Sequence, residues 1–90
     1  MKKYQILLKN KTVEKDWYAL EATIPDAMER CKSFLQDTPL DRLKSNGKLK
    51  KLRGKLDGIL QYDISDSARV QYLVDSKIGA VYIEYIGYHP

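Results

Sequence analysis

The chain has 90 residues and a formal net charge of +4, and 43% of its residues are hydrophobic and 31% are charged. This length and composition predict one soluble domain over residues 1–90 and exclude a disordered chain. Because no apolar run approaches the roughly 20 residues that span a bilayer and none resembles a signal peptide, we expect a cytoplasmic protein without a membrane anchor.

The first half of the chain is expected to form a strand and two helices. Residues 4–8 are short and apolar, as in a strand that ends in a turn. Thr12 can cap the next helix, in which apolar residues recur on one face at Val13, Trp17 and Leu20. Thr23 and Asp26 have capping-box spacing at the start of a second helix, which should stop at Pro39. The two helices should therefore form a hairpin.

The second half of the chain predicts three strands, over residues 59–64, 68–75 and 80–86. Short links between them favour an antiparallel arrangement. We therefore predict an α+β fold in the order strand, helix, helix, strand, strand, strand. Its small antiparallel sheet should carry the helical hairpin on one face.

Alternation along the strands predicts which side chains share a face of the sheet. The face covered by the helices should hold Val70, Tyr72, Val74, Val81, Ile83 and Tyr85. The open face should hold Arg69, Gln71, Leu73, Tyr82, Glu84 and Tyr88. His89 falls on the covered face unless Gly87 permits a bulge, so any role for His89 beside Arg69 requires a break at that glycine.

A basic segment over residues 44–55 contains six Lys or Arg residues and no acid, whereas the rest of the chain is slightly acidic. Leucines interleave with these cations, which lets the segment anchor to the core while its charges face outward. This pattern favours contact with nucleic-acid phosphates. The predicted RNA-binding residues are Lys48, Lys50, Lys51, Arg53 and Lys55.

Three short motifs over residues 48–89 carry a resemblance to a known family. They are Leu-Arg-Gly at 52–54 followed by Gly58, Arg-Val-Gln-Tyr at 69–72, and the closing Gly-Tyr-His at 87–89. In this order, and with this order of elements, they resemble the RelE/YoeB/YafQ toxins of bacterial type II toxin–antitoxin systems, in the RelE/ParE superfamily.

The resemblance implies a toxin that enters the ribosomal A site and cuts mRNA, and that is silenced by an acidic antitoxin encoded beside it. Oligomers are expected only through the antitoxin complex. By position, Arg69 matches the family's catalytic arginine and His89 matches the histidine that closes the YoeB-like and YafQ-like branches. Pro90 stands where those branches place an aromatic residue, so either Tyr88 takes over that role or the site is weaker or incomplete.

RNA cleavage without a metal or cofactor needs a base for the 2′-hydroxyl, a stabiliser of phosphorane charge and an acid for the leaving oxygen. The sequence contains no cluster of Cys or His residues with zinc-binding spacing, so we do not expect a metal site. Arg69 can bind phosphate oxygens or form a salt bridge with Glu84. His89 can carry a proton near neutral pH, or be a solvated terminal residue. Tyr88 can stack on a base or be a partly exposed strand residue.

Two other functions fit the same residues. One is a non-enzymatic inhibitor of DNA gyrase on the same fold, like the ParE relatives, although Arg69 and His89 argue against it. The other is a plain RNA-binding module, whose binding would depend steeply on salt.

Overall fold

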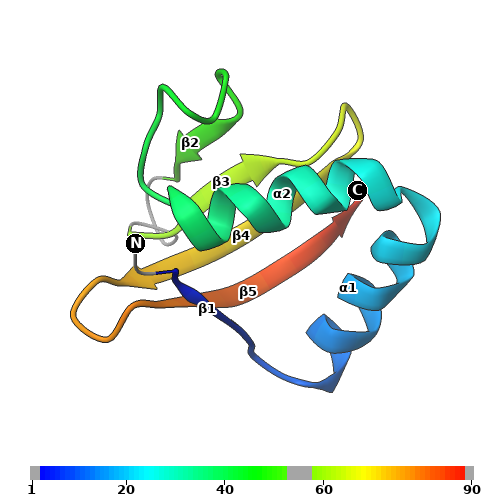
Figure 1. Ribbon diagram of the computed structural model, residues 1–90. Coiled ribbons are helices and arrows are strands. Elements are labelled where there is room, and N and C mark those ends of the chain that lie inside the picture. Colours follow the sequence, from blue (N-terminus) through cyan, green and yellow to red (C-terminus); the bar gives the residue numbers. More distant parts are fainter. Residues whose placement is uncertain (1–2, 53–57, 89–90) are drawn as a thin grey trace.

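The computed structural model describes residues 3–52 and 58–88, a part of the chain that contains two helices and one five-stranded sheet (Figure 1). The α+β class and the helical hairpin are confirmed. In chain order the elements are β1 (Gln5–Leu8), α1 (Lys11–Thr23), α2 (Pro25–Asp37), β2 (Leu49–Lys51), β3 (Leu60–Asp63), β4 (Ala68–Asp75) and β5 (Ala80–Tyr88). Neither of these helices is long and apolar enough to span a bilayer.

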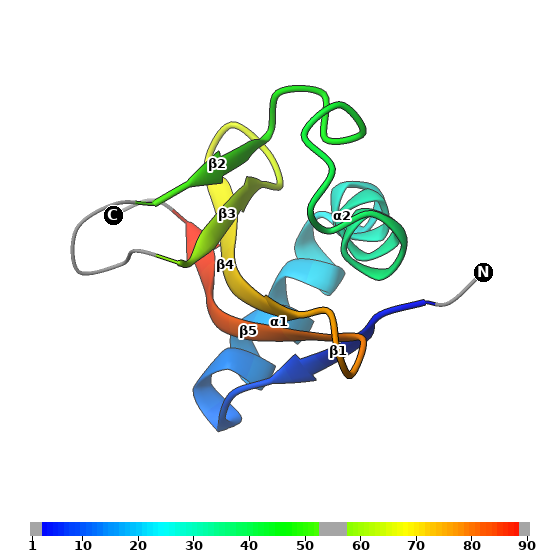
Figure 2. The ribbon, with the colours of Figure 1, turned by 90° about the vertical axis from the view of Figure 1, so that its left-hand side faces the viewer.

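The sheet has the strand order β1-β5-β4-β3-β2, and Figure 2 shows both helices on the same side of it. Strands β3, β4 and β5 pair antiparallel, as predicted, and β2 pairs antiparallel to β3, but β1 pairs parallel to β5, so the sheet is mixed. Strand β2 was not predicted. It has only three residues, Leu49 is buried and the other two are exposed lysines. Such a short segment shows no strand periodicity in the sequence and resembles a basic loop.

Both helices begin differently from the sequence prediction. The N-cap of α1 is Asn10, whose side-chain oxygen accepts a hydrogen bond from the Val13 N–H at 2.9 Å. Thr12 already lies inside the helix. Thr23 ends α1 and donates its hydroxyl to the Ala19 carbonyl, so it does not cap α2. Helix α2 begins at Pro25, which costs little because the N–H is unpaired at that position in any helix.

The core lies between the hairpin and the covered face of the sheet. Both helices contribute buried side chains at helical spacing: Val13, Trp17 and Leu20 from α1, and Met28, Cys31, Phe34 and Leu35 from α2. The ring of Phe34 stacks on that of Tyr62 in β3, with the centroids 4.7 Å apart. Burial of each large apolar side chain contributes about 1.5–3 kcal/mol, so this layer holds the sheet in place.

A register shift in β5 changes which side chains face the helices. Gln71 pairs with Tyr85 and the next residue, Tyr72, pairs with Ile83, which leaves Glu84 as one extra residue in β5. Beyond this bulge the alternation reverses. Ile86 is therefore buried at 1% exposure, whereas Tyr85, predicted to be covered, is 38% exposed.

Candidate functional site

The open face of the sheet centres on Arg69 in β4. Its register partners are Gly87 in β5 and Asp63 in β3, so these three residues share the face opposite the helices. The guanidinium carbon of Arg69 lies 5.6 Å from the centroid of the Tyr85 ring, which is a cation–π distance. Arg69 is thus held half-buried against an aromatic ring rather than extended into solvent.

Gly87 makes room for that ring. A Cβ atom at residue 87 would lie 2.9 Å from the Tyr85 hydroxyl oxygen. The same hydroxyl donates to the Tyr88 carbonyl at 3.1 Å, which fixes the ring over the glycine. The Gly-Tyr-His motif therefore has a structural reason for its glycine, which is the close approach of Tyr85.

A chain of hydrogen bonds crosses the open face from β4 to β2. The Gln71 amide donates to the Gln61 side-chain oxygen at 3.2 Å, and the Gln61 amide donates to Asp63 Oδ1 at 3.1 Å. The Lys50 ammonium pairs with Asp63 Oδ2 at 3.1 Å. Asp63, next to Arg69 in register, was not recognised from the sequence, because only the pairing of β3 with β4 brings them together.

Glu84, which was considered as a salt-bridge partner of Arg69, pairs with a lysine in the structure. Glu84, at the bulge, pairs with the Lys9 ammonium at 3.2 Å. Lys9 follows β1, which lies beside β5, so the parallel pairing of these strands explains this contact. The pairing of β1 was the part of the fold least visible in the sequence.

The basic segment is divided between two surfaces. Lys50 lies on the open face in register with Gln61, and Lys51 is in register with the buried Leu60. The Lys48 ammonium lies 5.9 Å from the Tyr62 ring centroid, on the side where Tyr62 meets α2. Arg53 and Lys55 lie outside the described residues. Among the described lysines, Lys50 therefore lies beside Asp63 on the open face and Lys48 lies against the Tyr62 ring.

Of the two terminal candidates, Tyr88 has a different position from the one predicted. Tyr88 is in register with the buried Ala68 and lines a hollow with Asp16 and Ala19 of α1, so it does not share the open face with Arg69. The bulge at Glu84 explains this change. His89 lies outside the described residues, and the break that its role required occurs at Glu84 instead of Gly87.

Among residues 3–52 and 58–88, no three His, Cys, Asp or Glu side chains are grouped as metal ligands would be. The described functional groups near Arg69 are the Asp63 carboxylate, the Lys50 ammonium and the Tyr85 phenol. Together they offer cations for a phosphate and one carboxylate beside them.

Comparison with known proteins shows what the fold is. No family model matches the chain, and no curated protein matches it. Solved structures match almost all of it. A chain of the RelBE2 toxin–antitoxin complex from Mycobacterium tuberculosis is 22% identical, with a TM-score of 0.70 over 97% of this chain and 99% of that one.

Two further structures give the same result. The YoeB/ParE toxin from Agrobacterium tumefaciens is 16% identical, with a TM-score of 0.73 over 96% of this chain and 99% of that one. YafQ from Escherichia coli is 13% identical, with a TM-score of 0.68 over 96% and 93%. The chain therefore has the fold of the RelE/YoeB-like toxins of toxin–antitoxin systems, and the resemblance read from the sequence is confirmed at the level of fold.

Proposed function

We propose that this chain is the toxin of a type II toxin–antitoxin system and cuts mRNA in the ribosomal A site. The observation that carries the proposal is the position of Arg69 on the open face, where its guanidinium contacts the Tyr85 ring beside Gly87. The fold that presents Arg69 in this way is shared with RelE, YoeB and YafQ toxins. The protein would act in the cytoplasm, and an acidic antitoxin would mask the open face.

In the proposed reaction the 2′-hydroxyl of the substrate attacks the adjacent phosphorus and the bond to the 5′-oxygen breaks. The products are a 2′,3′-cyclic phosphate and a 5′-hydroxyl. Arg69 binds the phosphoryl oxygens and offsets the negative charge that develops on them. The reaction moves one proton off the 2′-hydroxyl and one onto the leaving oxygen, and His89 performs one of these transfers.

The supporting groups divide the remaining tasks. Tyr85 orients the Arg69 guanidinium through the contact of its ring. Tyr88, which is 47% exposed, remains a candidate for contact with a base beside the site. Lys50 and Lys51, with Arg53 and Lys55, would dock the protein on rRNA and mRNA.

Substitution of the two proposed catalytic side chains tests this function. In a translation extract, His89→Ala and Arg69→Gln should each lower A-site cleavage of a reporter mRNA by about 10²- to 10⁴-fold. Primer extension on the mRNA measures the cleavage. The control variant is Lys77→Gln, in the exposed turn after β4, at the end of that strand far from Arg69. It should cleave the mRNA as the parent protein does. Unchanged cleavage by His89→Ala would remove His89 from the mechanism.

Gyrase inhibition is the second candidate, because one structural neighbour is described as a YoeB/ParE toxin. Expression of the protein would then arrest replication and leave mRNA intact. A supercoiling assay with purified gyrase separates the two functions, since a ribosome-dependent nuclease should leave supercoiling unchanged. A plain RNA-binding module would be inactive in both assays.

A further inference from the structure

A hollow of about 230 Å³ lies between α1 and the C-terminal end of β5, two segments that lie beside each other in Figure 1. We call it the β5-edge hollow. Both elements line it: Asp16, Ala19 and Leu20 from α1, and Tyr85, Ile86 and Tyr88 from β5. The aliphatic side chains from the two elements belong to the buried core, whereas both tyrosines are exposed. The hollow therefore has a fixed apolar bottom and an aromatic rim.

The hollow exists because β5 is longer than the strand beside it. β1 pairs with β5 only over residues 80–83, and the Lys9 N–H donates to the Ile83 carbonyl at 3.3 Å. After that contact the chain enters α1, and residues 84–88 of β5 have no strand neighbour on this edge in the described part of the chain. Backbone donors and acceptors on such an edge are available to a ligand.

Tyr85 connects the hollow to the open face of the sheet. Its ring centroid lies 5.6 Å from the Arg69 guanidinium carbon, and the same side chain lines the hollow. The hydrogen bond from its hydroxyl to the Tyr88 carbonyl, at 3.1 Å, holds the ring in this position. A nucleotide chain with one phosphate on Arg69 would therefore bring a neighbouring base to the hollow.

The lining of the hollow suits a base and not a phosphate. The two phenol rings can stack on a planar base, as aromatic side chains do in single-stranded nucleic-acid binding. The apolar bottom formed by Leu20 and Ile86 offers a phosphate no donor. The negative charge of Asp16 would repel a phosphate at this position. The polar contact of the hollow must therefore be with a group that donates hydrogen bonds.

Asp16 determines which base fits best. Within residues 3–52 and 58–88 its carboxylate forms no hydrogen bond or ion pair, so both oxygens can accept from a ligand. An ionised carboxylate only accepts hydrogen bonds. Guanine presents two adjacent donors on its Watson–Crick edge, the N1–H and the amino group, whereas adenine and cytosine present one donor beside an acceptor. Uracil presents one donor between two acceptors. The carboxylate therefore favours guanine.

We propose that the β5-edge hollow binds a guanine base next to the phosphate on Arg69, and that Asp16 is a specificity-determining residue. The Asp16 carboxylate accepts from the guanine N1–H and amino group, and Tyr88 contacts the face of the base. That this guanine belongs to a cleaved mRNA rests on the proposed function. The preference for guanine in binding does not.

The test measures binding without cleavage. The probes are short fluorescein-labelled thymidine oligodeoxynucleotides with one central guanine or adenine, which lack the 2′-hydroxyl that the proposed reaction needs. By fluorescence anisotropy, the parent protein should bind the guanine probe at least about fivefold more tightly than the adenine probe. In Asp16→Asn this ratio should fall to about twofold or less, because the amide offers one donor and one acceptor and so matches adenine.

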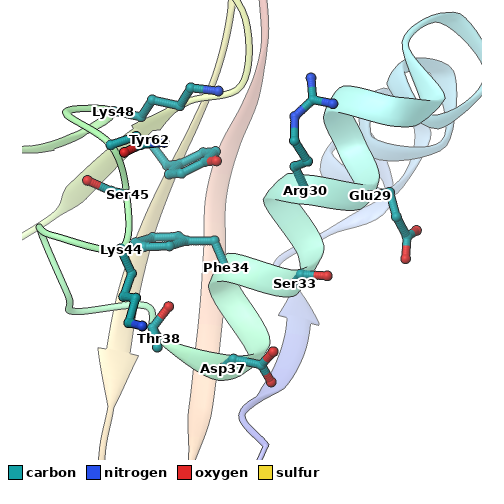
Figure 3. A pocket seen from close by; sticks show the side chains of 11 residues that line it. Glu29, Arg30, Ser33, Phe34, Asp37, Thr38, Lys44, Ser45, Lys48 and Tyr62 are labelled. Atoms are coloured by element: carbon teal, nitrogen blue, oxygen red, sulfur yellow. The ribbon is translucent and has the colours of Figure 1, made fainter.

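Two further variants separate the contact from charge and from structure. Asp37→Asn removes the same charge from a separate groove at the C-terminal end of α2, where Figure 3 shows this side chain, and should keep the parent's ratio. Asp16→Glu keeps the carboxylate and should retain part of the preference. Because the readout is a ratio of two affinities, a uniform gain in affinity from the lost negative charge does not change it.

The inference fails if the parent binds both probes equally, or if Asp16→Asn keeps the full preference. It also fails if Asp37→Asn lowers the ratio as much as Asp16→Asn does, which would mean that the effect is one of net charge. The nuclease activity is judged separately, by primer extension in the translation extract. A guanine preference without A-site cleavage would overturn the proposed function and leave the hollow as a base-binding site.

Discussion

The contact between Arg69 and Tyr85 depends on the absence of a side chain at Gly87. In most strands a glycine weakens packing, but here it lets the hydroxyl end of the Tyr85 ring approach the backbone, with its hydroxyl bonded to the Tyr88 carbonyl. The orientation of the guanidinium therefore depends on a residue that has no side chain of its own.

Gly87→Ala should separate activity from stability. The new Cβ would lie 2.9 Å from the Tyr85 hydroxyl oxygen, the far end of a side chain that can swing away, so the stability cost should be about 1 kcal/mol. The Tyr85 ring would move, and the Arg69 guanidinium would lose its contact with that ring. We therefore expect mRNA cleavage to fall at least tenfold in the translation extract. Adding Tyr85→Phe, which removes the clashing oxygen, should restore part of it. Full activity in Gly87→Ala would contradict this account.

Cys31 gives a second prediction, on stability against pH. It is fully buried on α2, and burial raises the pKa of its thiol from 9.0 to about 12. Below about pH 9 both the folded and unfolded states keep the proton, so the thiol contributes no pH dependence. Between pH 9 and 12 only the unfolded state loses the proton, so the free energy of unfolding falls.

Urea unfolding from neutral pH to about pH 10.5 measures this fall. Burial, then the neighbouring Cys31, also raises the pKa of the Tyr72 hydroxyl, so part of the fall belongs to the tyrosine. Cys31→Ala should be less stable at neutral pH because it loses buried volume, and its stability should decline less steeply above pH 9. A parallel decline in parent and variant would rule out the thiol as a cause.

At the scale of elements, the bulge in β5 determines the two faces of the site. The sequence was sufficient to predict α1, α2, β3, β4 and β5, because their apolar residues recur with helical or strand periodicity. It was not sufficient for the bulge, because β-branched and aromatic residues at 81–86 fit either phase of the alternation. Tyr85 and Tyr88 were therefore predicted on the wrong faces, and Tyr85 was missed as the neighbour of Arg69.

Deletion of Glu84 should leave the protein folded with both faces of β5 unchanged. Without the extra residue the strand alternates regularly, so Ile83 and Ile86 stay in the core and Tyr85 stays on the open face. We expect a loss of less than about 2 kcal/mol, measured by thermal and urea unfolding. Glu84→Ala keeps the bulge and removes only the exposed pair with Lys9, which should cost at most about 1 kcal/mol. Unfolding of the deletion variant while Glu84→Ala stays stable would mean that the faces of β5 depend on the bulge residue itself.

For the molecule as a whole, the sheet separates two surfaces that the sequence presents as one. The run of lysines before the sheet suggested a single RNA-binding surface, but Lys50 lies within β2 and Lys48 precedes it. Lys50 pairs with Asp63 on the open face, whereas Lys48 approaches Tyr62 on the side of α2. Residues two apart in a strand share a face, so this division arises because β2 begins only at Leu49.

This division predicts different effects on the salt dependence of RNA binding. A cation that contacts a phosphate of single-stranded RNA contributes about 0.7 to the slope of log affinity against log salt concentration. Lys50→Gln should therefore lower the slope measured by anisotropy with single-stranded RNA by about that amount. Lys48→Gln removes the same charge only two residues away and should leave the slope unchanged, because the Lys48 ammonium lies near the Tyr62 ring on the side of α2. An equal loss of slope in both variants would mean that RNA reaches both faces, and the basic segment would then act as the single stripe that its sequence suggests.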